Sequence, residues 1–69
     1  MTIQIVEDDG ALSDGIVLAL REPELCFVQS RDVKSAKEDF TERSSELVIL
    51  DVNLPDGSGY DYLKWLRER

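Results

Sequence analysis

The sequence predicts an α/β fold, in which a parallel sheet carries helices on its faces. Short apolar runs alternate along the chain with longer segments whose apolar residues recur at helical spacing. Two of the runs, residues 2–6 and 47–51, contain few polar positions, which is typical of strands covered on both faces. Three strands alternating with three helices through short loops imply right-handed crossovers and therefore a parallel sheet.

The first half of the chain is predicted to form a strand, a helix and a second strand. After the strand at residues 2–6, Gly10 interrupts the extended pattern. The helix that follows ends near Glu22, because Pro23 cannot continue it. The apolar stripe of this helix consists of Leu12, Ile16, Ala19 and Leu20. Residues 25–30 form the second strand.

The second half repeats this order. Asp32 is the expected N-cap of the second helix, whose weaker face consists of Val33, Ala36, Lys37 and Phe40. The third strand covers 47–51, and residues 53–59 are dense in turn-forming residues. Ser58 followed by Asp61 resembles a capping box for the last helix. That helix carries Tyr62, Leu63, Trp65 and Leu66.

Composition narrows the class of protein. The 69 residues suffice for one small domain, and 42% hydrophobic residues are ordinary for a globular chain. A net charge of −7 argues against a nucleic-acid surface, which requires clustered lysine and arginine. A single cysteine, Cys26, excludes an internal disulfide and favours a reducing compartment. Without a signal peptide or a long apolar run, we expect a cytoplasmic protein with no membrane contact.

Acidic residues follow two of the predicted strands. Glu7, Asp8 and Asp9 come directly after the first strand, and Asp51 ends the third. Taken singly, such acids are more often turn or helix-capping residues. In open α/β sheets, however, ligands bind beyond the carboxyl ends of the strands, so these carboxylates are expected to share one pocket. A hard divalent cation relieves the repulsion in such a cluster, and one carboxylate can act as a nucleophile.

The runs Ile3–Asp9 and Leu47–Gly59 together resemble the receiver domain of bacterial two-component response regulators. The resemblance extends over the whole chain. It rests on the acidic pair after the first strand, the spacing from that pair to Asp51, and the Asp-x-x-Leu-Pro-x-x-x-Gly run that ends at Gly59. It implies a flavodoxin-like receiver fold, here truncated to (βα)3 with a parallel sheet of order 2-1-3.

The resemblance also implies a role for each matching residue. Asp51 matches the aspartate that accepts a phosphoryl group from a sensor histidine kinase, in a phosphorelay that in many relatives controls transcription. Asp8 matches a direct Mg²⁺ ligand, and Glu7 matches the neighbour that acts on the metal through water. Asn53 matches the position whose backbone carbonyl binds the metal, with Asp51 as a further ligand. Gly59 matches a glycine near the start of the third helix. Enzymatic activity beyond Mg²⁺-assisted self-phosphorylation is not expected.

The chain departs from the complete family pattern after the third helix. Complete receivers have five strands, with a Ser or Thr ending the fourth and a Lys ending the fifth, and neither residue has a counterpart here. We therefore expect residues 1–69 to form a partial receiver domain. The third strand would then present an unpaired edge, which predicts a homo-oligomer formed through that edge.

Two other functions compete with the phosphoacceptor. One is an inactive receiver fragment that acts only as a self-associating structural module; Mg²⁺ binding would argue against it. The other is a Mg²⁺-dependent aspartyl phosphatase. Those enzymes place a second aspartate two residues after the nucleophile as general acid, whereas this chain has Asn53 there. Turnover of a phosphate ester would support the phosphatase.

Overall fold

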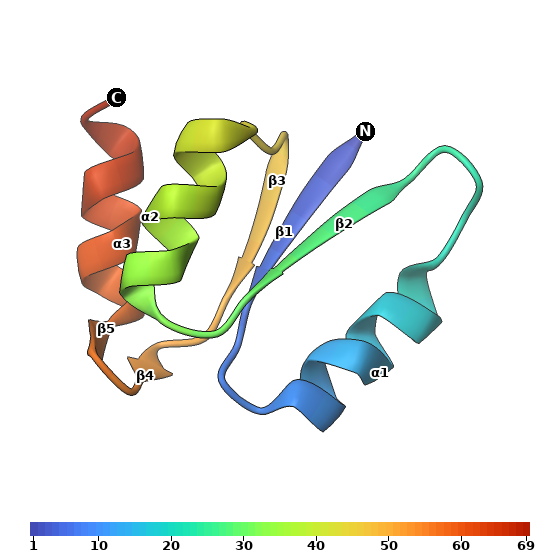
Figure 1. Ribbon diagram of the computed structural model, residues 1–69, viewed down its shortest axis with the longest axis horizontal. Helices are drawn as coiled ribbons and strands as arrows, with labels where there is room; N and C mark the ends of the chain where they lie inside the picture. Colours follow the sequence, from blue (N-terminus) through green and yellow to red (C-terminus); the bar gives the residue numbers. More distant parts are fainter.

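The computed structural model describes residues 1–69 and contains the predicted alternation of strands and helices (Figure 1). The elements in chain order are β1 (Thr2–Val6), α1 (Gly10–Leu20), β2 (Cys26–Ser30), α2 (Val33–Glu42), β3 (Leu47–Leu50), β4 (Asn53–Leu54), β5 (Gly57–Ser58) and α3 (Gly59–Arg67). The main strands agree with the predicted ranges to within one residue at each end. None of the helices has the length and apolar character needed to cross a membrane.

β1 is the central strand of a three-stranded parallel sheet of order β2-β1-β3, which confirms the predicted order 2-1-3. Ile5 lies in register with Gln29 of β2 on one side and with Ile49 of β3 on the other. All five residues of β1 are buried, as its uninterrupted run predicts. β3 pairs only with β1, so its outer edge carries no strand.

The two faces of the sheet are covered unequally. Helices α2 and α3 lie side by side over one face, and α1 lies alone over the other (Figure 1). The core occupies the two-helix side, and its buried residues are Val6, Val33, Ala36, Leu54 and Tyr62. Side chains from β3 and α3 pack against this cluster. The core therefore joins β1 directly to the start of α2 and to the segment after β3.

A buried polar network adds to this core. Gln4 is fully buried in β1, and its Nε2 donates to the Ser30 hydroxyl and to the Ala36 carbonyl, both at 3.0 Å. Its Oε1 accepts a hydrogen bond from the Tyr62 hydroxyl. The Ser30 hydroxyl in turn donates to Asp39 at 2.7 Å. Burial raises the pKa of Tyr62 to about 12. These hydrogen bonds satisfy the buried amide of Gln4 and link β1 to β2, α2 and α3.

The predicted apolar stripe of α1 is only partly buried, with Ile16 half-buried and the other three residues exposed. Leu12 is 53% exposed and Ala19 is exposed, whereas the only buried residue of α1 is Ser13. The Ser13 hydroxyl accepts a hydrogen bond of 2.8 Å from the Gln29 side chain of β2. α1 has no neighbouring helix on its side of the sheet, so nothing covers its flank. Periodicity alone identified the helix but not the direction in which it faces.

Residues 53–59, predicted to form a turn, contain a short antiparallel hairpin, β4–β5. Each of its strands has two residues, and Pro55 and Asp56 form its tip. The predicted capping box at Ser58 and Asp61 is wrong. Ser58 caps α3 by accepting from the Tyr60 N–H at 3.1 Å, and Asp61 makes no reciprocal bond. A complete capping box occurs instead at the start of α2, between Asp32 and Ser35.

Candidate metal centre

The acidic residues lie where β1 and β3 end side by side. Val6 and Leu50 are in register, so the residues that follow them are neighbours. The backbone N–H of Asp51 donates to the Val6 carbonyl at 2.9 Å, and that of Glu7 donates to the Ser30 carbonyl at 2.9 Å. The sheet hydrogen bonding thus continues one residue beyond each strand and holds the backbone of both acids.

Three carboxylates meet at this edge. Oxygen atoms of Glu7, Asp8 and Asp51 all lie within 4.8 Å of one another. Asp8 is exposed, while Glu7 and Asp51 are half-buried. A donor set that consists only of oxygen, on an incompletely buried surface, matches the ligand preference of Mg²⁺ and fits poorly with softer metals.

The crowding changes the acidity of Glu7. The hydrogen bond from the Asp9 backbone N–H, 3.2 Å from Oε2, is the strongest single influence and lowers the pKa of Glu7. Desolvation, the Asp8 carboxylate and the negative charge of Asp51 act against it and together raise this pKa above its ordinary value. The cluster is therefore under electrostatic strain that a bound cation would relieve.

Asp9 and Asn53 flank this cluster without adding a side chain to it. Asp9 is the N-cap of α1 and accepts from the Leu12 N–H at 3.2 Å. Asn53 lies at the start of β4 with its side chain exposed, and its backbone N–H is 3.4 Å from Asp51 Oδ1. The backbone N–H of Asn53 is thus directed toward Asp51 of the cluster.

Gly59 allows α3 to begin directly against the backbone of Asp51. Its N–H donates to the Val52 carbonyl at 2.7 Å. A Cβ at this position would overlap the Asp51 carbonyl oxygen and lie 3.1 Å from the Val52 Cα. Any side chain here would push Asp51 away from its present position.

A polar hollow of about 170 Å³ adjoins the cluster between α1 and β2. Its lining contains no hydrophobic residue and consists of Glu7, Asp8, Gly10, Ser13, Gln29, Ser30 and Arg31. Asp51 is not among these residues, so the hollow meets the cluster only at Glu7 and Asp8. This side of the site is accessible to water and small polar ligands.

One residue that sequence reasoning did not single out is Asp56. Its carboxylate accepts hydrogen bonds from the backbone N–H groups of Val33 and Lys34 at the start of α2. The local sequence around Asp56 indicates only a turn. Its partners are more than 20 residues away, so no local pattern could have revealed the contact.

Comparison with known proteins identifies relatives of this chain. The family model for the response regulator receiver domain matches residues 3–69. The response regulator protein PilR of Pseudomonas aeruginosa is 31% identical over 94% of this chain and 15% of its own length. The sensory transduction protein RegX3 of Mycolicibacterium smegmatis is 35% identical over 99% of this chain and 30% of its own. The cell cycle response regulator CtrA of Brucella ovis is 35% identical over 97% of this chain and 29% of its own length.

A solved structure has the same fold. The non-phosphorylated HemR receiver domain from Leptospira biflexa superposes with a TM-score of 0.86 at 27% identity. The match covers 97% of this chain and 54% of that one. The chain thus spans about half of the solved receiver and less than a third of the curated regulators. With its flavodoxin-like receiver fold and its match over residues 3–69, the chain belongs to the response regulator receiver domain family.

Proposed function

We propose that this chain is a phosphoacceptor module of a two-component phosphorelay, in which Asp51 receives a phosphoryl group from a sensor histidine kinase. The observation that carries the proposal is the meeting of three carboxylates, with oxygens within 4.8 Å of one another, at the adjoining ends of β1 and β3. Asp51 is the member of this cluster that directly follows β3, and it is half-buried.

In this proposal the chain's own residues hold the metal. Asp8, which is exposed, and Asp51 would bind it directly, Glu7 would act through water, and Asn53 would contribute its backbone carbonyl. Bound Mg²⁺ would neutralise the negative charge that a phosphoryl group brings to three carboxylates. The stability of the fold should therefore increase when Mg²⁺ is added.

The transfer itself is a simple displacement. A carboxylate oxygen of Asp51 forms a bond to phosphorus while the bond from phosphorus to the imidazole nitrogen of the donor breaks, and that nitrogen takes up a proton. The product is an acyl phosphate on Asp51. The hydrogen bond from the Asp51 N–H to the Val6 carbonyl holds the backbone from which the carboxylate extends, which favours positioning for attack. The added charge can then bias the surrounding loops.

The experiment that tests the proposal uses a small acyl-phosphate donor with Mg²⁺ and reads the product by intact mass. A phosphate-sized gain that requires both Mg²⁺ and Asp51 supports phosphoacceptor function. Asp51→Asn should abolish the gain. Asp61→Asn removes an equal charge from an exposed position on α3 and should leave it intact. No gain in folded protein would refute the proposal for this chain.

A second candidate function rests on a different observation. The outer edge of β3 is unpaired, and Leu47 on this strand is 45% exposed. We propose that this edge mediates self-association, in which case residues 1–69 could act as a structural module even if Asp51 accepts no phosphoryl group. Failure of phosphorylation together with a stable oligomer would favour this second function over the first.

A further inference from the structure

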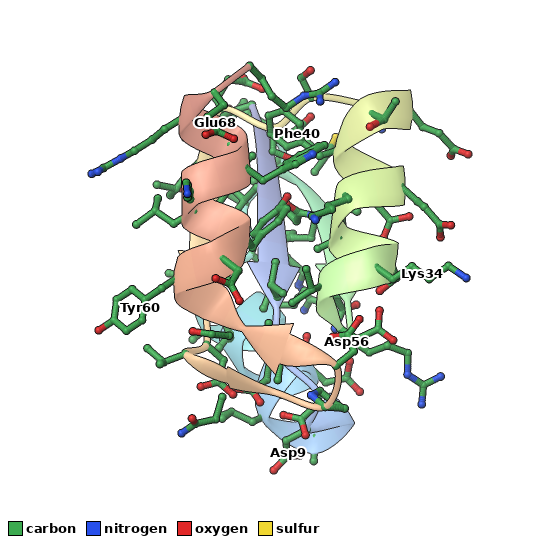
Figure 2. The ribbon with its side chains drawn as sticks, turned by 90° about the vertical axis from the view of Figure 1, so that its left-hand side faces the viewer. Asp9, Lys34, Phe40, Asp56, Tyr60 and Glu68 are labelled. Carbon is green, nitrogen blue, oxygen red and sulfur yellow. The ribbon has the colours of Figure 1, made fainter.

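Asp56 connects the loop after β3 to a different helix. It lies at the tip of the β4–β5 hairpin. One carboxylate oxygen accepts from the Val33 N–H at 2.7 Å and the other accepts from the Lys34 N–H at 2.9 Å. Figure 2 shows Asp56 at the N-terminal end of α2, on the same side as Lys34.

Two carboxylates cap the start of α2, and each accepts hydrogen bonds from different backbone N–H groups. The first N–H groups of a helix have no partner within the helix and carry its positive dipole end. Asp32, the N-cap, accepts from Ser35 N–H at 2.8 Å. Asp56 takes the two N–H groups that Asp32 leaves, those of Val33 and Lys34. Asp32 acts within its own turn, whereas Asp56 reaches across from another part of the chain.

The two hydrogen bonds from α2 to Asp56 help to fix the segment that contains Asn53. At one end of the segment, the Asp51 N–H is bonded to the Val6 carbonyl at 2.9 Å. At the other end, the Gly59 N–H is bonded to Val52 at 2.7 Å. Between these points the two strands of the hairpin pair with each other, and the Asn53 N–H is 3.4 Å from Asp51 Oδ1. The hairpin is joined to the rest of the fold by the buried side chain of Leu54, which has no directional preference, and by the two hydrogen bonds of Asp56, which do.

We propose that Asp56 is a positioning residue of the metal centre: by bonding to the start of α2, it sets the backbone of Asn53 relative to Asp51. This inference rests on the proposed function, since it concerns the Asn53 carbonyl as a metal ligand. Residues that orient metal ligands typically contribute 10- to 100-fold to metal affinity. Asp56 thereby makes the position of α2 part of the geometry of the site.

The first test measures the loop without any metal. Amide hydrogen exchange in the hairpin is compared among the wild-type chain, Asp56→Ala and Asp32→Ala. Asp56→Ala should accelerate exchange of the Asn53 and Gly59 amides, which bond to Asp51 and Val52, by about tenfold or more, because local opening becomes easier. Asp32→Ala should accelerate exchange in the first turn of α2 and leave the hairpin unchanged. Unchanged hairpin exchange in folded Asp56→Ala would overturn the inference.

The second test measures Mg²⁺ affinity by calorimetry in the same proteins. Asp56→Ala should weaken Mg²⁺ binding by about tenfold. Asp61→Ala, which removes the same charge from an exposed carboxylate on α3, should change it by less than about twofold, as expected for a screened surface charge. Equal weakening by Asp56→Ala and Asp32→Ala would mean that Asp56 acts only by stabilising α2, and would overturn the inference.

A conservative variant protects the test against loss of folding. Asp56→Asn keeps one acceptor oxygen and should give intermediate values in both measurements, with circular dichroism as the check on folding. If the wild-type chain binds no Mg²⁺, the proposed function fails in this chain. The exchange measurement still decides separately whether Asp56 fixes the hairpin.

Discussion

Gly59 shows how one missing side chain determines the position of the candidate nucleophile. Only hydrogen fits between the start of α3 and the Asp51 carbonyl. The site therefore depends on a residue that contributes no chemical group of its own.

Replacement of Gly59 by Ala is expected to destabilise the fold by about 1–3 kcal/mol, because an added methyl group must displace the backbone of Asp51. Phosphorylation by an acyl-phosphate donor should fall in the protein that remains folded. Gly15→Ala is the matched control, since a Cβ at Gly15 meets nothing within 4 Å in the middle of α1. That variant should gain about 0.5–1 kcal/mol. Urea unfolding of both variants checks the difference, and equal effects would contradict it.

The charge of Glu7 destabilises the metal-free protein, although the same charge would favour the proposed metal ion. Its pKa is raised in the folded state, so the folded protein binds a proton more readily than the unfolded chain. Protonated Glu7 therefore contributes to the stability of the metal-free protein. This contribution is fully present below the pKa that Glu7 has in the unfolded chain, and it is lost as the pH rises through the higher pKa of the folded state.

We therefore expect Glu7→Gln to stabilise the metal-free protein at neutral pH and to weaken Mg²⁺ binding. The first effect follows from removal of repulsion with Asp8 and Asp51, and the second from loss of a charge that holds the metal. Thermal unfolding with and without Mg²⁺ measures both effects in one protein. A metal-free variant less stable than wild type would show that the cluster is not strained.

At the scale of elements, β3 differs from β1 in having one free edge. Its four residues pair with β1 only, and they are exposed or half-buried rather than buried. An apolar strand with unpaired backbone groups is a template for pairing with another chain.

We predict that the chain associates at high concentration and that Leu47→Lys reduces this association, because charge on an edge strand opposes pairing. Leu18→Lys places the same charge on α1, where the side chain is 66% exposed, and should have little effect. Sedimentation velocity over a range of concentrations distinguishes the two variants. A wild-type chain that remains monomeric at high concentration would refute the prediction.

At the scale of the whole molecule, the proposed metal site is expected to couple to the net charge of the chain. The chain carries a net charge of −7, and three of its carboxylates meet at one edge of the sheet. In the proposed function, a bound cation would reduce this repulsion, and it would bind only the folded chain because the site joins loops from β1 and β3.

Mg²⁺ should therefore stabilise the whole fold, by about 2.7 kcal/mol at a concentration one hundred times the Kd. The rise in Tm should be saturable and reversed by a chelator. Asp8→Ala should abolish it, whereas Asp14→Ala, at an exposed position on α1, should retain it. A Tm that rises equally in both variants would indicate a general salt effect rather than a site.

The sequence by itself determined the order of the elements and the approximate place of the acidic cluster. Continuous apolar runs and helical periodicity are local signals, and parallel strands bring their carboxyl ends to one edge. Asp8 and Asp51, distant in the chain, were for this reason expected near each other, and the structure places them together. Local turn chemistry likewise identified Asp32 as an N-cap.

Only the tertiary structure decided which side chains are bonded across the fold. The bonds of Gln4 to α2 and α3, of Ser13 to β2, and of Asp56 to α2 all join residues far apart in sequence. Nothing in the local sequence distinguishes Asp56 from an ordinary turn residue, or Ser13 from an exposed one. Such contacts depend on the packed orientation of whole elements, which periodicity leaves undetermined because each helix can rotate about its own axis.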